Sequence, residues 1–328
     1  MPAGRGGALC LAFLFDLALG EPPERWHPVC WMGRLVSAAE RPFTSRTGFG
    51  GLKRAGGAAA AVALPLATYV AVDRVARMLP RPVRFLFEAA CIWTALAARS
   101  LYDGAAGVER GLSQGIEEGR RQVARLVGRD TGGLDGAGVA RAAVESVAEN
   151  TNDGVVAPMF YASIGGAPLA LAYKMVNTLD SMVGYRHEPY RDFGWGPARL
   201  DDLAGYLPAR VTAAAVVAAA PLTGARPLRA ARAWRRDAGR HESPNAGVCE
   251  SAFAGALGVR LGGDDNYGGA VRERAVMGAG YREPGPGDIA AAARLMLAAA
   301  AAVLAAALAL SRLCAWPAGS GLRGGGDG

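Results

Sequence analysis

Acidic and amide side chains are concentrated between Glu145 and Asp153. Glu145 and Glu149 are four residues apart, and Asn150 and Asp153 follow directly. Residues four apart lie on the same face of a helix, so the two glutamates would be neighbours. Carboxylate and amide oxygens of this kind bind Mg²⁺ together with substrate phosphates. On spacing alone the simpler interpretation is a solvated helix face on which Arg141 pairs with the glutamates.

A second polar pair, Asn177 and Asp180, lies in an otherwise apolar stretch. The two residues are three apart, so they share one face if Tyr173–Val183 is helical. An ionisable group beside a membrane segment needs a partner or an ion to offset its desolvation, which marks Asp180 as a functional candidate. The alternative is a helix end, closed by Gly184.

An aromatic and cationic cluster follows in the segment Tyr185–Arg191. Arg186 is suited to phosphate, because a guanidinium group can donate two hydrogen bonds to it at once. Tyr185 can stack on a ligand or donate a hydrogen bond. The alternative is an interfacial belt of aromatic side chains, with arginines that reach toward lipid headgroups.

Arg199, Asp201 and Asp202 form a third polar group, and His27 stands alone near the N-terminus. Adjacent aspartates can supply metal ligands, but neighbouring residues on a helix point in different directions. One of the two is therefore expected to pair with a cation or to cap a helix. His27, between Trp26 and Pro28, fits a structural role as readily as a ligand-binding one.

The polar groups alternate with apolar runs that approach the length of a membrane span. Ala55–Val72 has 18 residues without a charged side chain, and a helix needs about 20 to cross the hydrocarbon core. Gly6–Phe15 fits a retained first helix better than a signal peptide, because Asp16 interrupts it and no cleavage site follows. The remaining runs are Phe85–Ala98, Gly154–Tyr173, Val211–Ala225 and Leu295–Ser311.

The composition favours a helical membrane protein. Hydrophobic residues make up 51% and charged residues 20%, and much of the apolar content is alanine, which packs closely between helices. No strand-type alternation is sustained and no internal repeat is evident. We therefore predict an all-α, polytopic helical membrane protein whose polar inter-helix loops form the active site. Residues 1–318 would be a single integral-membrane domain, and Gly319–Gly328 a disordered tail.

The net charge of +7 indicates membrane topology rather than nucleic acid. The arginines lie in loops that flank apolar runs, without a basic stripe interleaved with aromatic residues, so we expect no nucleic-acid partner. The loops Glu21–Arg54 and Ser100–Asp153 would share one face, which their Lys and Arg content makes cytoplasmic. Proline and glycine inside Gly154–Tyr173 indicate that this segment re-enters the membrane or packs inside the protein rather than crossing. The five cysteines have no C-x-x-C spacing, so neither a disulfide framework nor a cysteine metal site is supported.

Many sequence blocks, in one order along the chain, resemble the adenosylcobinamide-phosphate synthase family (CobD/CbiB) of cobalamin biosynthesis. One departure is Gly20–Glu21–Pro22, where the family usually has Gly-Asp-Pro. The blocks that carry the resemblance are Asp16–Leu17, Gly20–Pro22, His27–Val29, Gly33–Leu35, Val127–Thr131, Glu145–Ser146, Glu149–Thr151, Asp153–Gly154, Val176–Tyr185, Phe193–Trp195, Arg199–Asp202 and Ser243–Gly247.

The resemblance implies an ATP- and Mg²⁺-dependent carbon–nitrogen ligase. Its reaction would join a carboxylate of adenosylcobyric acid to the amine of (R)-1-aminopropan-2-yl phosphate. The resemblance also implies a multi-pass protein of the cell membrane, in contact with lipid and with other membrane enzymes of cobalamin assembly. Standard nucleotide motifs are absent from the sequence, so the ATP site would be non-standard.

The roles of individual residues are our own hypothesis within that reaction. We expect Glu145, Glu149 and Asp180 to be catalytic, and Asp153, Asp201 and Asp202 to hold Mg²⁺. The expected substrate-binding residues are His27, Arg129, Asn150, Asn177, Tyr185, Arg186, Arg199 and Asn245.

Two other functions compete with the ligase. A non-enzymatic membrane carrier or scaffold for corrinoids would need the aromatic and amide residues but not the acidic clusters. A phospholipid-headgroup transferase would need a D-G-x-x-A-R pattern. That pattern begins at Asp103–Gly104 but fails at Gly107 and Val108, which disfavours the transferase.

Overall fold

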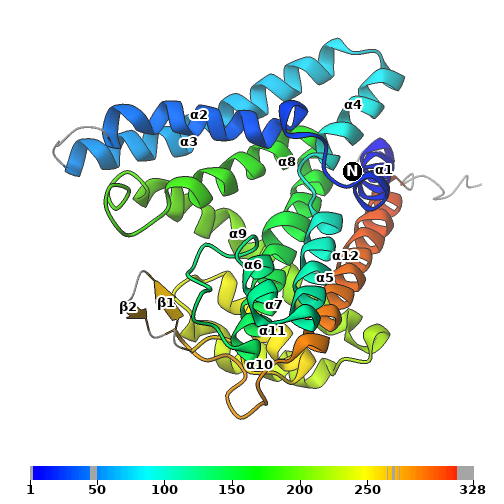
Figure 1. Ribbon diagram of the computed structural model, residues 1–328. Helices are drawn as coiled ribbons and strands as arrows, with labels where there is room; N and C mark the ends of the chain where they lie inside the picture. Colours follow the sequence, from blue (N-terminus) through cyan, green and yellow to red (C-terminus); the bar gives the residue numbers. More distant parts are fainter. Residues whose placement is uncertain (1–2, 45–49, 264, 268–269, 273, 316–328) are drawn as a thin grey trace, which may run out of the picture.

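The computed structural model describes residues 3–44, 50–263, 265–267, 270–272 and 274–315, and helices make up most of them (Figure 1). Two short antiparallel strands, β1 (Asp265–Tyr267) and β2 (Ala270–Arg272), form the one ladder in this part of the chain. The all-α prediction is therefore confirmed. The helices are α1 (Ala3–Leu19), α2 (Pro28–Thr44), α3 (Gly50–Met78), α4 (Arg81–Trp93), α5 (Ala98–Gln114), α6 (Ile116–Val123), α7 (Gly136–Asn150), α8 (Ala157–Val183), α9 (Trp195–Ala219), α10 (Pro227–Asp237), α11 (Ala246–Leu257) and α12 (Pro286–Ala315).

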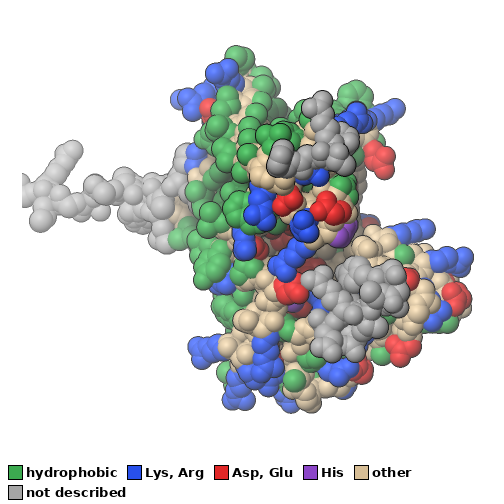
Figure 2. Space-filling model, turned by 90° about the vertical axis from the view of Figure 1, so that its left-hand side faces the viewer, with side chains coloured by type: hydrophobic (Ala, Val, Ile, Leu, Met, Phe, Trp, Pro, Cys, Tyr) green, Lys and Arg blue, Asp and Glu red, His purple; other side chains and the backbone are tan. Residues whose placement is uncertain are grey.

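Four helical segments are long and apolar enough to cross a membrane, which confirms the polytopic membrane character. In Figure 2, hydrophobic side chains cover much of the upper part of the molecule, and charged side chains of both signs gather around a hollow below them. The four segments are Gly50–Met78, Gly136–Val183, Trp195–Thr223 and Pro286–Arg312.

The sequence prediction of spans was right for three runs and wrong for one. Ala55–Val72, Val211–Ala225 and Leu295–Ser311 fall in, or largely in, the segments that begin at Gly50, Trp195 and Pro286. The predicted span Phe85–Ala98 is not one helix, because α4 has 13 residues and ends at Trp93. A helix of that length rises only ~20 Å, short of the hydrocarbon thickness of about 30 Å.

Helix α7 runs through the core rather than along its surface. Ten of its 15 residues are buried, and Glu145 is only 3% exposed. Alanines on α7, α5 and α12 make up much of the surrounding core, and such small side chains allow close helix packing. The interpretation of the Arg141–Glu145–Glu149 face as solvated is therefore wrong, because this face is enclosed by later parts of the chain.

Helix α8 is a hairpin of two helical arms. Gly166 has φ 71° and ψ −162°, a conformation that side chains with a Cβ rarely adopt. Across the turn, the rings of Tyr161 and Tyr173 stack with centroids 5.0 Å apart. Asn177 donates a hydrogen bond to Asp153 over 3.4 Å. The arms, 157–165 and 167–183, have 9 and 17 residues and rise by ~14 and ~26 Å. The segment therefore turns back, as the sequence predicted.

The hairpin begins and ends at specific backbone contacts. At its tip, the Arg5 guanidinium donates to the carbonyl of Ile164 over 2.7 Å, which satisfies a carbonyl at the end of the first arm. At its base, Thr151–Val156 is a π-helical segment. The Gly154 carbonyl there accepts a hydrogen bond from the N–H of Ala97 over 2.9 Å. Such widened turns re-aim side chains and recur at functional sites.

The N-terminal and C-terminal predictions have different outcomes. Gly6–Phe15 lies within α1, where Leu9 and Ala12 are fully buried in the main core. The predicted tail Gly319–Gly328 lies outside the described residues.

Candidate functional site

The base of the α8 hairpin opens on an acidic cavity of about 230 Å³. Asp153 comes from the π-helical segment, Asp180 from the returning arm of α8, and Asp201 from the first turns of α9. We call this space the acidic cavity. It is lined by Glu149, Asn152, Asp153, Asp180, Asp201, His241, Ser243, Asn245, Ala246 and Cys249.

The three aspartates of the acidic cavity form no ion pair with a described residue, although Lys174 attracts Asp153 and Asp201 electrostatically. Asp153 accepts hydrogen bonds from the amides of Asn152, over 2.7 Å, and Asn177. The Oδ1 atom of Asp201 is buried without a hydrogen-bond partner. Among the described residues, no Lys or Arg forms an ion pair with any of the three. Buried carboxylates that repel one another are costly unless a cation or ligand joins them.

Backbone geometry brings Asp180 close to the end of its helix. The N–H of Gly184 bonds the carbonyl of Asp180 over 2.7 Å, as the alternative reading of the sequence expected. A Cβ at position 184 would clash with the Oδ1 atom of Asp180. The helix-end role and the place of Asp180 in the cavity are therefore compatible, and both depend on this glycine.

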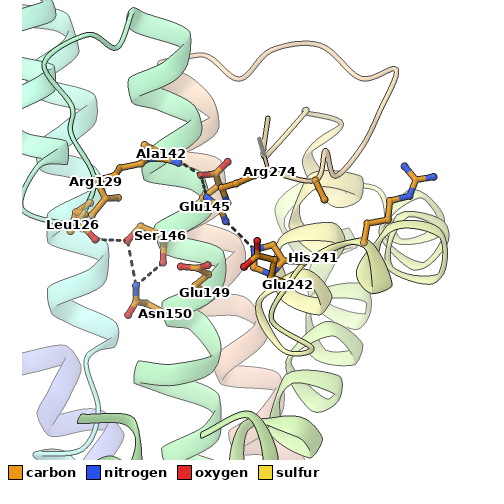
Figure 3. A pocket seen from close by; sticks show the side chains of 14 residues that line it. Leu126, Arg129, Ala142, Glu145, Ser146, Glu149, Asn150, His241, Glu242 and Arg274 are labelled. Atoms are coloured by element: carbon orange, nitrogen blue, oxygen red, sulfur yellow. Dashed lines mark hydrogen bonds and ion pairs between the residues drawn. The ribbon is translucent and has the colours of Figure 1, made fainter. Parts of the chain in front are cut away.

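A larger cavity of about 500 Å³ adjoins the first (Figure 3). Arg129, Arg240 and Arg274 line it, so we call it the arginine cavity. It shares Glu149 and His241 with the acidic cavity. The other polar side chains of its lining are Glu145, Ser146, Asn150 and Glu242.

Glu145 is the most completely bonded carboxylate of the site. It accepts from the guanidinium of Arg129 over 2.7 Å, from Arg274 over 3.4 Å and from the N–H of Gly262 over 2.6 Å. Arg129 and Glu145 are both less than 10% exposed. The contacts tie α7 to two segments remote in sequence, so the geometry suits positioning of the arginines by Glu145.

Glu149, His241 and Glu250 meet where the two cavities join. Each offers one ligand atom, and these atoms lie within 4.8 Å of one another; this is the one such group found in the described part of the chain. Burial raises the pKa of the Glu250 carboxyl to about 7. Burial, together with the Arg274 guanidinium, lowers the pKa of the His241 imidazole below its usual value.

Of the arginines predicted to bind phosphate, Arg129 lines the arginine cavity, and Arg186 and Arg199 line neither cavity. Arg186 forms an exposed ion pair with Glu242 over 2.9 Å. The ring of Tyr185 stacks on His187, with centroids 5.2 Å apart. Arg199 pairs with Asp202 over 3.6 Å, as the sequence expected for one aspartate of the pair.

The predicted amide residues occupy different places. Asn245 lines the acidic cavity, donates to the carbonyl of Asp202 over 2.9 Å and accepts from Arg210 over 3.1 Å. Asn150 lines the arginine cavity and donates to the carbonyl of Ser146 over 2.9 Å.

His27 is not brought to either cavity. It lines a separate space of about 270 Å³, together with Glu21 and Lys174. Its Nδ1 atom accepts from the N–H of Val29 over 3.2 Å. Lys174 lies on the returning arm of α8 and is attracted electrostatically by both Glu21 and Asp153, so it lies between this space and the acidic cavity.

Sequence reasoning missed Arg274, Glu250 and Lys174. Glu250 and Lys174 each carry a charge within an apolar helix, and that signal could have marked them. Arg274 lies in a polar segment and gave no such signal.

Comparison with known proteins shows the family of this chain. The model of the CobD/Cbib protein family matches residues 9–296. The chain is 43% identical to the cobalamin biosynthesis protein CobD of Klebsiella pneumoniae subsp. pneumoniae, over 88% of this chain and 92% of that protein. It is 41% identical to the cobalamin biosynthesis protein CbiB of Salmonella typhimurium, with the same coverage. No solved structure matches it.

The fold defines a polytopic helical membrane protein with two adjoining polar cavities. The match over most of its length then fixes the family. The chain belongs to the CobD/CbiB family of cobalamin biosynthesis proteins, as the sequence blocks indicated.

Proposed function

We propose that the protein is an adenosylcobinamide-phosphate synthase. It would form an amide between a carboxylate of adenosylcobyric acid and the amine of (R)-1-aminopropan-2-yl phosphate, with ATP and Mg²⁺. The observation that carries the proposal is the junction of an arginine-lined cavity with an acidic one at Glu149 and His241. Such a junction suits a reaction that joins a phosphorylated group to an amine.

The reaction requires activation, because a carboxylate is a poor acyl donor. Transfer of the γ-phosphoryl group of ATP to a carboxylate oxygen gives an acyl phosphate and ADP. The amine then attacks the carbonyl carbon, the C–N bond forms, the C–O bond to phosphate breaks, and phosphate leaves. The amine must lose a proton during this attack, so a carboxylate nearby accelerates it.

The acidic cavity fits Mg²⁺. Its donors are oxygens, and the Oδ1 atom of Asp201 is buried without a hydrogen-bond partner. Asp153 and Asp201 would hold the ion, which binds proteins through one or two carboxylates plus substrate phosphates. Bound there, Mg²⁺ would neutralise the negative charge of the phosphoryl oxygens. Asp202 lies outside this lining and would act on the site only through Arg199.

Charged side chains of the chain would do the remaining work. Arg274 and Arg240 line the larger cavity and would bind phosphate oxygens, and Arg186 would attract anions at the rim. Asp180, without a cationic partner among the described residues, would take the amine proton. Glu149 stands where both cavities meet and would orient the attacking amine.

The reaction would take place at the cytoplasmic side of the cell membrane. The protein would be a multi-pass protein of the cell membrane, with both cavities open to the cytoplasm where ATP is available. Membrane lipid would surround the spans, and other membrane enzymes of cobalamin assembly would be its neighbours.

The test uses membranes that contain the protein, supplied with adenosylcobyric acid, aminopropanol phosphate and Mg-ATP. Chromatography and mass spectrometry follow adenosylcobinamide phosphate and the nucleotide product. One ADP per amide is the expected result. Tight corrinoid binding without product would replace the ligase with the carrier function.

A further inference from the structure

Three side chains from separate parts of the chain converge at the junction of the cavities. Glu149 ends α7, His241 precedes α11, and Glu250 lies in the middle of α11. The His241 Nε2 atom lies 3.7 Å from the Oε1 atom of Glu250. The three ligand atoms lie within 4.8 Å of one another. Two ligand atoms that each bind one ion at ~2.1 Å are at most ~4.2 Å apart. Shifts of these side chains by a few tenths of an ångström would therefore let all three reach the same ion.

The carboxylates at this junction outnumber the cations. Arg129 and Arg274 both pair with Glu145, and Arg274 also reaches the Oε1 atom of Glu250 over 3.1 Å. Glu149 forms no ion pair with any Lys or Arg in the described ranges. Both guanidinium groups thus form ion pairs with Glu145, one of them also with Glu250, and neither forms an ion pair with Glu149.

An independent observation points to a ligand between the carboxylates. Glu250 is fully buried, and its Oε2 atom has no hydrogen-bond partner. Its carboxylate also contacts that of Glu149. Two buried carboxylates in contact need a proton or a cation between them. A shared proton would join only the two carboxylates, whereas a metal ion could also bind the imidazole, whose ligand atom lies within 4.8 Å of theirs.

The histidine can present a lone pair to the same point. Arg274 approaches the Nε2 atom of His241 over 3.0 Å, and a guanidinium group can only donate, so Nε2 accepts in this contact. The N–H of Ser243 donates to the Nδ1 atom over 2.9 Å, and the carbonyl of the same residue lies 3.3 Å from it. The tautomer with its proton on Nδ1 would donate to this carbonyl and leave Nε2 to a metal, as is usual for a histidine ligand.

We propose that Glu149, His241 and Glu250 bind one divalent transition-metal ion at the junction of the two cavities. One imidazole and two carboxylates suit Mn²⁺, Fe²⁺, Co²⁺ or Zn²⁺ better than Mg²⁺, which prefers oxygen ligands alone. The site is distinct from the Asp153–Asp201 pair. Ion binding here does not depend on the proposed ligase reaction, because its ligands belong to this chain.

Arg274 is the competitor of the ion. One of its nitrogens, Nη2, contacts both the His241 imidazole and Glu250, whereas Nη1 contacts Glu145. Ion entry would displace the first two contacts and leave the pair with Glu145. Removal of the guanidinium charge should therefore strengthen binding.

The test is a Mn²⁺ titration of the full-length protein, purified in detergent and stripped of metal with a chelator. Free Mn²⁺ is measured by electron paramagnetic resonance in millimolar Mg²⁺, which occupies oxygen-only sites. We expect one tightly bound Mn²⁺ per chain. Glu250→Gln and His241→Asn should each weaken its binding by about tenfold or more, and Arg274→Gln should strengthen it.

The matched control is Glu242→Gln. Glu242 lines the same cavity as Glu149, but its side chain is 54% exposed and it is not one of the three ligands. Its replacement should leave Mn²⁺ binding unchanged, and circular dichroism checks that each variant is folded. Absence of Mn²⁺ binding to the wild type in excess Mg²⁺ would overturn the proposal. Equal binding by wild type and both ligand variants, or binding only after Arg274→Gln, would also overturn it.

Discussion

Two groups of buried carboxylates, eight residues apart in sequence, differ in their partners. Glu145 is bonded by two guanidinium groups and a backbone N–H. Asp153 and the facing Asp201 have amide contacts or none, and no Lys or Arg of the described residues pairs with either. The carboxylate of the first group is saturated by hydrogen bonds and ion pairs. The carboxylates of the second group can still bind a cation or a ligand.

The comparison separates stability from function. Glu145 connects α7 to Arg129 and to the segment around Gly262, so its charge holds distant parts of the chain together. The acidic cavity makes no such connection through ion pairs. Replacement of a paired carboxylate should therefore lower stability, and replacement of an unpaired one should lower activity.

The largest effect is expected in the acidic cavity. Asp180→Asn should reduce amide formation by about 10²- to 10⁴-fold, because it removes the proton acceptor and keeps the shape of the side chain. The product assay measures the rate, and the melting temperature in detergent should stay near that of the wild type. Unchanged turnover would remove Asp180 from the mechanism.

Neighbouring aspartates offer a matched pair for the same cavity. Asp201 lines it, whereas Asp202 pairs with Arg199 outside the lining. Asp201→Asn should raise the Mg²⁺ concentration needed for half-maximal activity by about tenfold or more, because one oxygen ligand is lost. Asp202→Asn should change this value much less. An equal shift in both variants would contradict the assignment.

A stability effect is expected at the paired carboxylate. Glu145→Ala leaves the Arg129 guanidinium buried without this counter-ion, and breaking a buried pair costs about 3–5 kcal/mol. Thermal unfolding in detergent should show a clearly lowered melting temperature. A melting temperature equal to that of the wild type would show that the pair does not hold the fold.

A smaller loss of stability is expected at the hairpin tip. Gly166→Ala places a Cβ on a backbone with φ 71° and ψ −162°, and a residue forced into such a region costs of order 1–3 kcal/mol. Gly133→Ala is the control, because a Cβ there meets no atom within 4 Å and its φ lies outside the left-handed range. Equal melting temperatures of the two variants would show that the turn tolerates a side chain.

The smallest effect concerns the pH dependence of Mn²⁺ binding at the junction. The ion binds the ionised Glu250, whose pKa burial raises to about 7, so a fall from pH 8 to pH 6 should weaken binding by about tenfold. Burial and the Arg274 guanidinium lower the pKa of the His241 imidazole, so protonation of this ligand competes less with the ion than at an exposed histidine. Affinity independent of pH would contradict this assignment. The charged groups that face Glu250 are Arg129, Glu145, Glu149, His241 and Arg274.

The sequence alone determined the local architecture and the family. The lengths of the apolar runs gave three of the spans, and proline and glycine near Gly166 indicated the returning hairpin, because these signals act over one or two helical turns. The predicted span at Phe85–Ala98 failed because hydrophobicity does not show where a helix stops, and α4 ends at Trp93.

Only the tertiary structure decided which charges are paired. Glu145 and Glu149 look alike in sequence, four residues apart on one helix. One is neutralised by Arg274, which lies 129 residues further along the chain, and the other faces Glu250 across the junction. Spacing along a helix fixes neighbours within a turn or two. The electrostatic potential at a buried carboxylate depends on charged side chains from segments that are distant in the sequence. No local sequence pattern shows which segments these are.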